Sequence, residues 1–119
     1  MSYASSPPVE VVYADPPVTE APTGVIDASC YRQVEAAGIL RGTDQEEAAQ
    51  QLVDFLLSEP FQADVPLSMF VFPVREGVEL PEVFVQHAAV PAEPLELAPE
   101  VIDEHREAWI DQWTDLVLR

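Results

Sequence analysis

Twelve prolines against four glycines in 119 residues are the feature that most limits how this chain can fold. Proline fixes φ and lacks a backbone N–H, so it interrupts helices and central strands and favours stiff, extended connections. The segment 15–23, DPPVTEAPT, is therefore predicted to be a loop with polyproline-like stretches. The length suits one small domain or a piece of a larger one.

The second constraint is charge: 22 Asp and Glu against 5 Lys and Arg give a formal charge of −17. Such a polyanion excludes nucleic acid as an expected partner and disfavours an anionic membrane surface. Simple disorder is not expected, because 48% of the residues are hydrophobic. No apolar run approaches the roughly 18 residues that a membrane-spanning helix needs.

Two helices are predicted from the spacing of apolar residues. The first covers 44–57, with a capping-box pattern of Thr43 and Glu46 at its start and Pro60 as its stop. The second runs from Ala98-Pro99 to about Leu118. Trp109 and Trp113 lie one turn apart on the apolar stripe of this terminal helix. Packing in a core is preferred for them over an aromatic wall for a ligand.

Three other segments are less regular. The β-branched residues at 9–12 favour a β-segment over a helical turn. The segment 30–40 fits either a strand or a helix, and a short turn is expected at Phe61-Gln62. The apolar run 69–74 predicts a buried strand or an extended segment lining an interior. In a strand, Phe70 and Phe72 would share one face.

The N-terminal residues offer a candidate binding element. Ser5-Ser6-Pro7 is typical of a helix start, with a serine N-cap and proline at the first helical position. Tyr3 adds an aromatic face beside two hydroxyls, and the helix N-terminus could receive a phosphate or a hydroxyl. An ordinary helix cap is an equally good interpretation of these residues.

No catalytic or metal-binding residues are predicted. Cys30 with His87 or His105 lacks the sequence context of a nucleophile and its base. The two histidines lack zinc-ligand spacing, and the single cysteine excludes an internal disulfide. With 22 acids, a catalytic carboxylate pair cannot be chosen from sequence.

Five sequence blocks, taken in order, carry a resemblance to a known family. The blocks are SYASSP at 2–7, YRQVEAAG at 31–38, AQQLVDFLLSEPFQ at 49–62, MFVFPV at 69–74 and REAWIDQW at 106–113. Together they resemble the C-terminal third of the thiamine-binding solute-binding proteins of bacterial ABC importers. The block ending in SEPFQ is shared with iron- and polyamine-binding relatives, whereas the SYxxSP start, the RQVE block and the WxxxW ending are more specific.

The resemblance implies an α/β chain that is the incomplete C-terminal portion of a two-lobed, type II periplasmic-binding-protein fold. The ligand would lie between lobes that close by a hinge, and no chemistry would be performed. The family's ligand-contacting stretch falls on Tyr3, Ala4, Ser5 and Ser6, and its stacking aromatic falls on Phe70. Val9 replaces a further aromatic of some relatives.

The expected ligand is thiamine or a thiamine phosphate, whose cationic thiazolium ring suits aromatic faces. No other cofactor is expected. The expected partner is the membrane permease, and the expected location is the periplasm or the outer cell surface. The secretion signal would lie in a missing N-terminal part, because residues 1–8 contain none.

As a fragment, 1–119 is expected to divide into a ligand-side strand or helix start at 1–14, a Pro-rich loop at 15–29, an α/β segment at 30–97 and a C-terminal helix at 98–119. Without an opposing cleft wall, it is expected to bind thiamine weakly or not at all. Two alternatives stay open. One is a solute-binding protein for ferric iron, sulfate or polyamine, and the other is a free-standing acidic module that docks a partner through the apolar stripe of 98–118.

Overall fold

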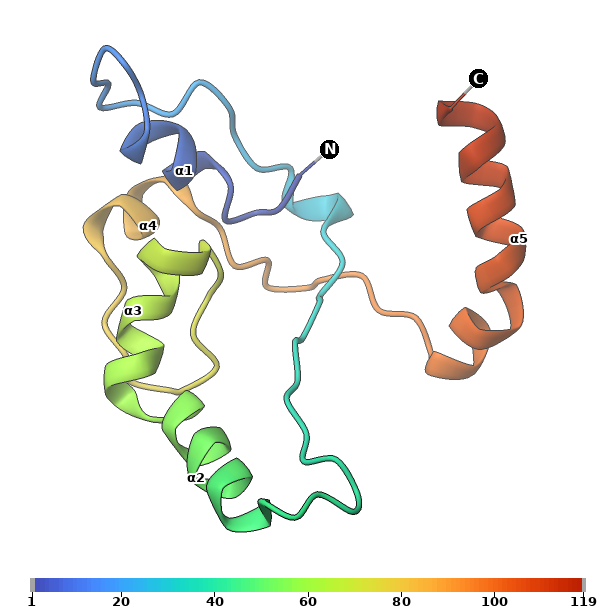
Figure 1. Ribbon diagram of the computed structural model, residues 1–119. Coiled ribbons are helices and arrows are strands. Elements are labelled where there is room, and N and C mark those ends of the chain that lie inside the picture. The colour runs from blue at the N-terminus through green and yellow to red at the C-terminus, as the bar shows by residue number, and fades with distance from the viewer. Residues whose placement is uncertain (1, 119) are drawn as a thin grey trace.

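The computed structural model describes residues 2–118, and these residues form helices joined by long irregular segments (Figure 1). The helices are α1 (Pro7–Val12), α2 (Glu46–Leu56), α3 (Glu59–Met69), α4 (Glu82–His87) and α5 (Pro99–Val117), with a 3₁₀ turn at Asp27–Ser29. Within residues 2–118 there is no strand, only an isolated parallel bridge between Tyr31 and Leu95. None of the helices in this range is long and apolar enough to cross a membrane.

The expected α/β fold, as part of a two-lobed type II binding protein, is therefore wrong for the described chain. A strand is stable only when a neighbouring strand satisfies its backbone groups, and no segment here supplies such an edge. Residues 9–12 are helical instead, because Pro7 and Pro8 fix the backbone in the first turn of α1. The run 69–74 is divided between the last residue of α3, a left-handed Phe70 and an irregular segment.

The buried core is small and lies where α1 packs against α4, close to α3. Its buried hydrophobic side chains are Val65 and Phe84, with relative exposures of 6% and 1%. Three prolines are also buried, which are Pro7 and Pro8 in α1 and Pro66 inside α3. Rigid, apolar proline rings thus fill volume that larger side chains occupy in most cores.

The helix predicted over 44–57 is confirmed as α2, but its predicted capping box is wrong. Gln45 occupies the N-cap position and makes no side-chain cap. The Thr43 hydroxyl instead accepts a hydrogen bond from the Gln45 N–H at 3.2 Å. The predicted short turn after Pro60 is a complete helix, because Pro60 lies in the first turn of α3, where its missing N–H costs nothing.

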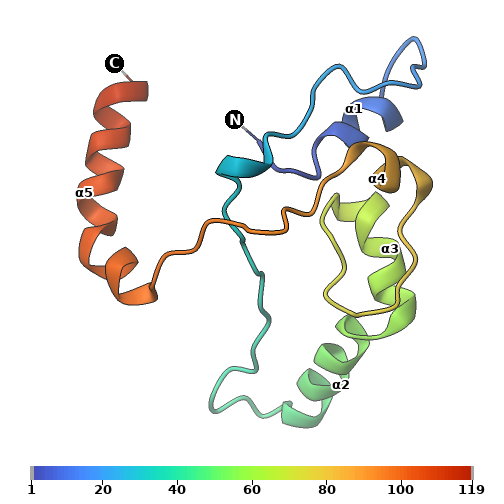
Figure 2. The same cartoon turned by 180° about the vertical axis from the view of Figure 1, so that it is seen from behind.

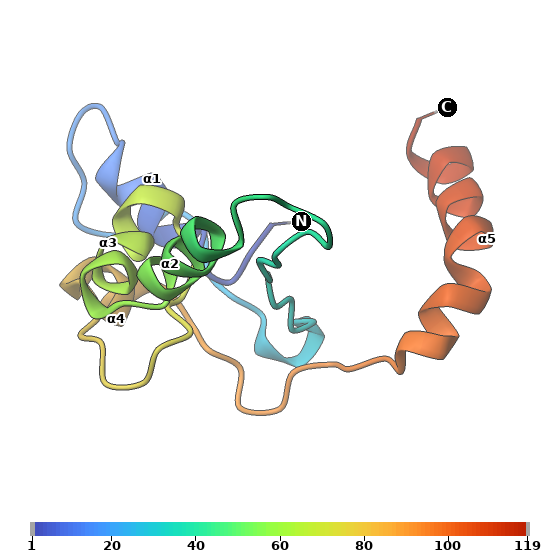
Figure 3. The same ribbon diagram turned by 60° about the horizontal axis from the view of Figure 1, so that its bottom comes forward.

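The terminal helix is also confirmed, as α5, but it stands apart from the other helices (Figures 2 and 3). Trp109 and Trp113 are 40% and 51% exposed, so the prediction that they pack in a core is wrong. The radius of gyration is 17.9 Å, whereas a compact chain of this length would have about 14 Å. Side chains spaced for burial therefore face solvent along α5.

Candidate ligand-binding site

The predicted helix start at Ser5-Ser6-Pro7 is confirmed, and Ser6 is the residue that shapes it. The Ser6 N–H donates to the Tyr3 carbonyl at 3.0 Å, and the Ser6 carbonyl accepts from the Val9 N–H at 2.9 Å. The Ser6 hydroxyl accepts from the Tyr3 N–H at 3.2 Å and lies 2.6 Å from the Ser2 hydroxyl. Its hydroxyl therefore caps the preceding turn rather than α1 itself.

The other residues of this stretch differ in how open they are. The Tyr3 side chain is 67% exposed, whereas Ser5 is buried at 5%. The Ala4 carbonyl accepts a hydrogen bond from the Ala89 N–H at 3.2 Å, which attaches the N-terminal turn to the chain that follows α4. The stretch thus presents the Tyr3 ring to solvent, whereas most of the surface of Ser5 is buried.

Phe70, the other predicted site residue, lies at the opposite end of α1 from this turn. Its ring centroid is 5.8 Å from that of Tyr13, the residue that ends α1, and 6.3 Å from that of Phe84 in α4. Its backbone is left-handed, with φ 54° and ψ 42°. With a rise of about 1.5 Å per residue, α1 separates the two parts of the predicted site by about 9 Å.

Tyr13 is not one of the site residues predicted from the sequence, although the structure places its ring in contact with Phe70, which is one. The β-segment predicted at 9–12 does not place Tyr13 at the end of a helix. The sequence signal for Tyr13 is the helix start at Ser6-Pro7. A helix of six residues that begins at Pro7 ends at Val12, so the side chain of Tyr13 follows the helix end and is exposed. Val9, where some relatives have an aromatic, is half-buried in α1.

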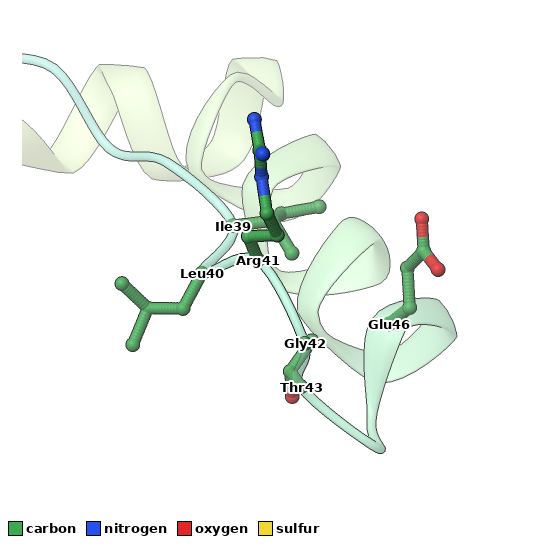
Figure 4. A pocket seen from close by; sticks show the side chains of 6 residues that line it. All are labelled: Ile39, Leu40, Arg41, Gly42, Thr43 and Glu46. Atoms are coloured by element: carbon green, nitrogen blue, oxygen red, sulfur yellow. The ribbon is translucent and has the colours of Figure 1, made fainter.

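Two hollows of the described surface lie away from these residues. A shallow depression of about 270 Å³ precedes α2, where Arg41 and Glu46 line it together with Ile39, Leu40, Gly42 and Thr43 (Figure 4). A second, more open one of about 400 Å³ is lined by the first residues of α2, including Glu46 and Glu47. Neither contains a predicted site residue: Tyr3 is on the open surface, and Phe70 is half-buried.

The candidate catalytic and metal-binding side chains are dispersed. Cys30 contacts the Ile26 carbonyl, with Sγ 3.6 Å from the oxygen. His105 lies against Trp109 on α5, with ring centroids 5.5 Å apart. Across residues 2–118, no three His, Cys, Asp or Glu side chains are grouped so that they could hold a metal ion.

Comparison with known proteins gives a partial relationship. The chain is 36% identical over 89 residues to the thiamine-binding periplasmic protein of Salmonella typhimurium, and equally so to that of Escherichia coli. Each match covers 75% of this chain but only 27% of the relative, so the chain corresponds to about a quarter of the length of these proteins. No protein-family model matches the chain. No solved structure matches it significantly.

Proposed function

We propose that this chain contributes one wall of a thiamine-binding site in a solute-binding protein of an ABC importer. The observation that carries the proposal is the 36% identity over 89 residues to two thiamine-binding periplasmic proteins. Its function is then binding without catalysis. Its ligand is thiamine or a thiamine phosphate, its location is the periplasm or outer surface, and its partner is the permease that accepts the ligand.

The exposed ring of Tyr3 supports a cationic ligand. An aromatic face attracts a cation over its centre, by about 0.5–1 kcal/mol at an exposed site. The first 31 residues contain Glu10, Asp15, Glu20 and Asp27 and no Lys or Arg, so the side chains of this segment bring no positive charge near Tyr3. The acidic chain as a whole favours the approach of a cation at low ionic strength.

The buried Ser5 and the internally bonded Ser6 leave few polar groups at Tyr3 to hold a hydroxyl or a phosphate. Aromatic contact on one side of the ligand then has to provide most of the affinity. A ligand held from one side keeps much of its surface in water, whereas tight small-molecule sites bury most of it. The proposal therefore includes weak thiamine binding by the 119-residue chain, with a dissociation constant above the micromolar range.

Titration of the isotope-labelled chain with thiamine, followed by amide and aromatic NMR shifts, tests the proposal. We expect saturable shifts at residues 3–6, and Tyr3→Ala should weaken thiamine binding by about two- to fivefold, since it removes one exposed aromatic face. Tyr31→Ala is the matched control, because Tyr31 is 51% exposed and lies outside the site. Ferric citrate, sulfate and spermidine, added separately, test the other cargo classes.

Three outcomes would each contradict a part of the proposal. Absence of any saturable thiamine shift up to millimolar concentration would remove the ligand assignment. Equal effects of Tyr3→Ala and Tyr31→Ala would remove the N-terminal site, although thiamine could still be the ligand. Micromolar or tighter binding by this chain alone would contradict the one-wall argument.

The exposed stripe of α5 favours a second candidate, an acidic module that docks onto a partner protein. Six large apolar side chains of α5 are exposed and lie on one side of the helix: Val101, Trp109, Ile110, Trp113, Leu116 and Val117. The opposite side carries six acids, whereas Arg106 lies on the apolar side, one turn before Trp109 and Ile110. This function predicts a stable, folded monomer without thiamine-induced shifts, and saturable thiamine shifts would contradict it.

A further inference from the structure

Three aromatic rings from three separate segments form a continuous series from the core to the surface. Phe84 in α4 is 1% exposed, and its ring is stacked on that of Phe70 with an interplanar angle of 22°. Phe70 in turn contacts Tyr13 at a tilt of 54°. Tyr13, the outermost ring, is 71% exposed. The rings of Phe84 and Phe70 thus lie behind the exposed ring of Tyr13.

The conformation of Phe70 is unusual for its residue type. A left-handed backbone is unfavourable for a residue with a side chain, and glycine is the common choice where α-helices end in this way. Phe70 keeps this conformation at the end of α3 between the rings of Tyr13 and Phe84. Such outliers concentrate at sites where a side chain must be presented in one direction.

The charges around Tyr13 favour a cation at its open face. Glu10 and Asp15 are its nearest charged neighbours in sequence, and Glu10 is fixed by a hydrogen bond from the Thr23 hydroxyl at 2.6 Å. The arginine closest in sequence to Phe70, Arg75, is directed to α2, where its Nη1 donates to the Leu57 carbonyl at 3.2 Å. Arg32 is paired with Glu96. These two arginines therefore have other partners, and the segment around Tyr13 supplies only anions.

We infer that the exposed face of Tyr13, supported by Phe70, is a binding face for a flat organic cation. The inference deepens the proposed function by naming a tyrosine that receives a cationic ring such as thiazolium, and to that extent it rests on that function. The tyrosine face supplies the attraction to positive charge, and Phe70 holds that face in position. Glu10 and Asp15 add a long-range preference for a cation over a neutral ring.

A matched pair of small probes tests the inference without requiring that thiamine bind. 1-Methylnicotinamide is flat and cationic, and nicotinamide has nearly the same shape without the charge. We expect the cation to shift the ring resonances of Tyr13 and Phe70 in a saturable way, and the neutral probe to bind at least twofold more weakly. No shift at Tyr13, or equal binding of the two probes, would overturn the inference.

Variants then separate this inference from the proposed function. Tyr13→Ala should weaken both 1-methylnicotinamide and thiamine by about two- to fivefold, whereas Tyr13→Phe keeps a ring and should stay within twofold of the parent. Tyr31→Ala serves as the exposed-tyrosine control. If thiamine binds and Tyr13→Ala leaves its affinity unchanged, the inference fails and the proposed function stands. If 1-methylnicotinamide binds at Tyr13 and thiamine produces no saturable shift anywhere in the chain, the proposed function fails and the cation face stands.

Discussion

The side-chain amide of Gln62 accepts a hydrogen bond from the Val74 N–H, with its oxygen 2.8 Å from the nitrogen. The same amide donates through Nε2 to the Leu56 carbonyl at 2.7 Å. Gln62 is 6% exposed, so its amide is largely shielded from water, although Val74 itself is 61% exposed. One buried side chain in α3 thus connects the end of α2 to the segment that follows Phe70.

Gln62→Ala should destabilise the fold by about 1–3 kcal/mol, because it leaves two backbone groups without their partner in a poorly solvated place. Gln62→Glu keeps the acceptor for the Val74 N–H but directs a carboxylate at the Leu56 carbonyl. Its loss of stability should therefore be smaller at acid pH, because the protonated acid can donate to that carbonyl. Urea unfolding measures both. Gln51→Ala, on the exposed side of α2, is the control, and an equal loss there would contradict the assigned role.

At position 70 we expect the usual order of stability of the alanine and glycine variants to be reversed. In most positions glycine is the less stable replacement, because it loses more conformational freedom on folding. At φ 54° the left-handed cost disappears with glycine, so Phe70→Gly should be more stable than Phe70→Ala by about 1 kcal/mol. Thermal unfolding of both variants measures the difference.

Phe72 supplies the matched comparison for this pair. Its ring also contacts Phe84, at 5.8 Å, but its backbone does not have a positive φ. Phe72→Ala should therefore be the more stable of the two replacements there. If positions 70 and 72 gave the same order, Phe70 would not have the left-handed backbone.

Ser58 is an N-cap residue without a capping bond. It precedes α3 with an extended backbone, but its hydroxyl oxygen is buried and has no hydrogen-bond partner among the described residues. Removing a capping serine ordinarily costs about 1 kcal/mol, whereas Ser58→Ala should cost less than about 0.5 kcal/mol. Ser6→Ala, which removes a bonded hydroxyl, is the comparison in the same denaturation assay. A larger loss at Ser58 than at Ser6 would show that the Ser58 hydroxyl caps α3.

The tryptophans of α5 should behave as solvent-exposed side chains. We expect acrylamide to quench their fluorescence nearly as well as that of N-acetyltryptophanamide, and urea to change the emission wavelength little. This follows from the 40% and 51% exposures of Trp109 and Trp113. Strong protection from acrylamide in the monomer would show that α5 packs against the remaining helices.

Sequence alone determined the helices at 46–56 and 99–117, the helix start at Ser6-Pro7 and the irregular proline-rich segment, because these depend on local periodicity, capping and fixed φ angles. Several features depended instead on contacts between distant segments. Residues 9–12 could form a strand only with a neighbouring strand, and Phe70 met Tyr13 and Phe84 only after α1, α3 and α4 came together. The stripe of α5 predicted burial, but spacing cannot specify the surface that covers it. Tertiary structure alone therefore decided the absence of a sheet in residues 2–118, the separation of Tyr3 from Phe70 and the open tyrosine face at the end of α1.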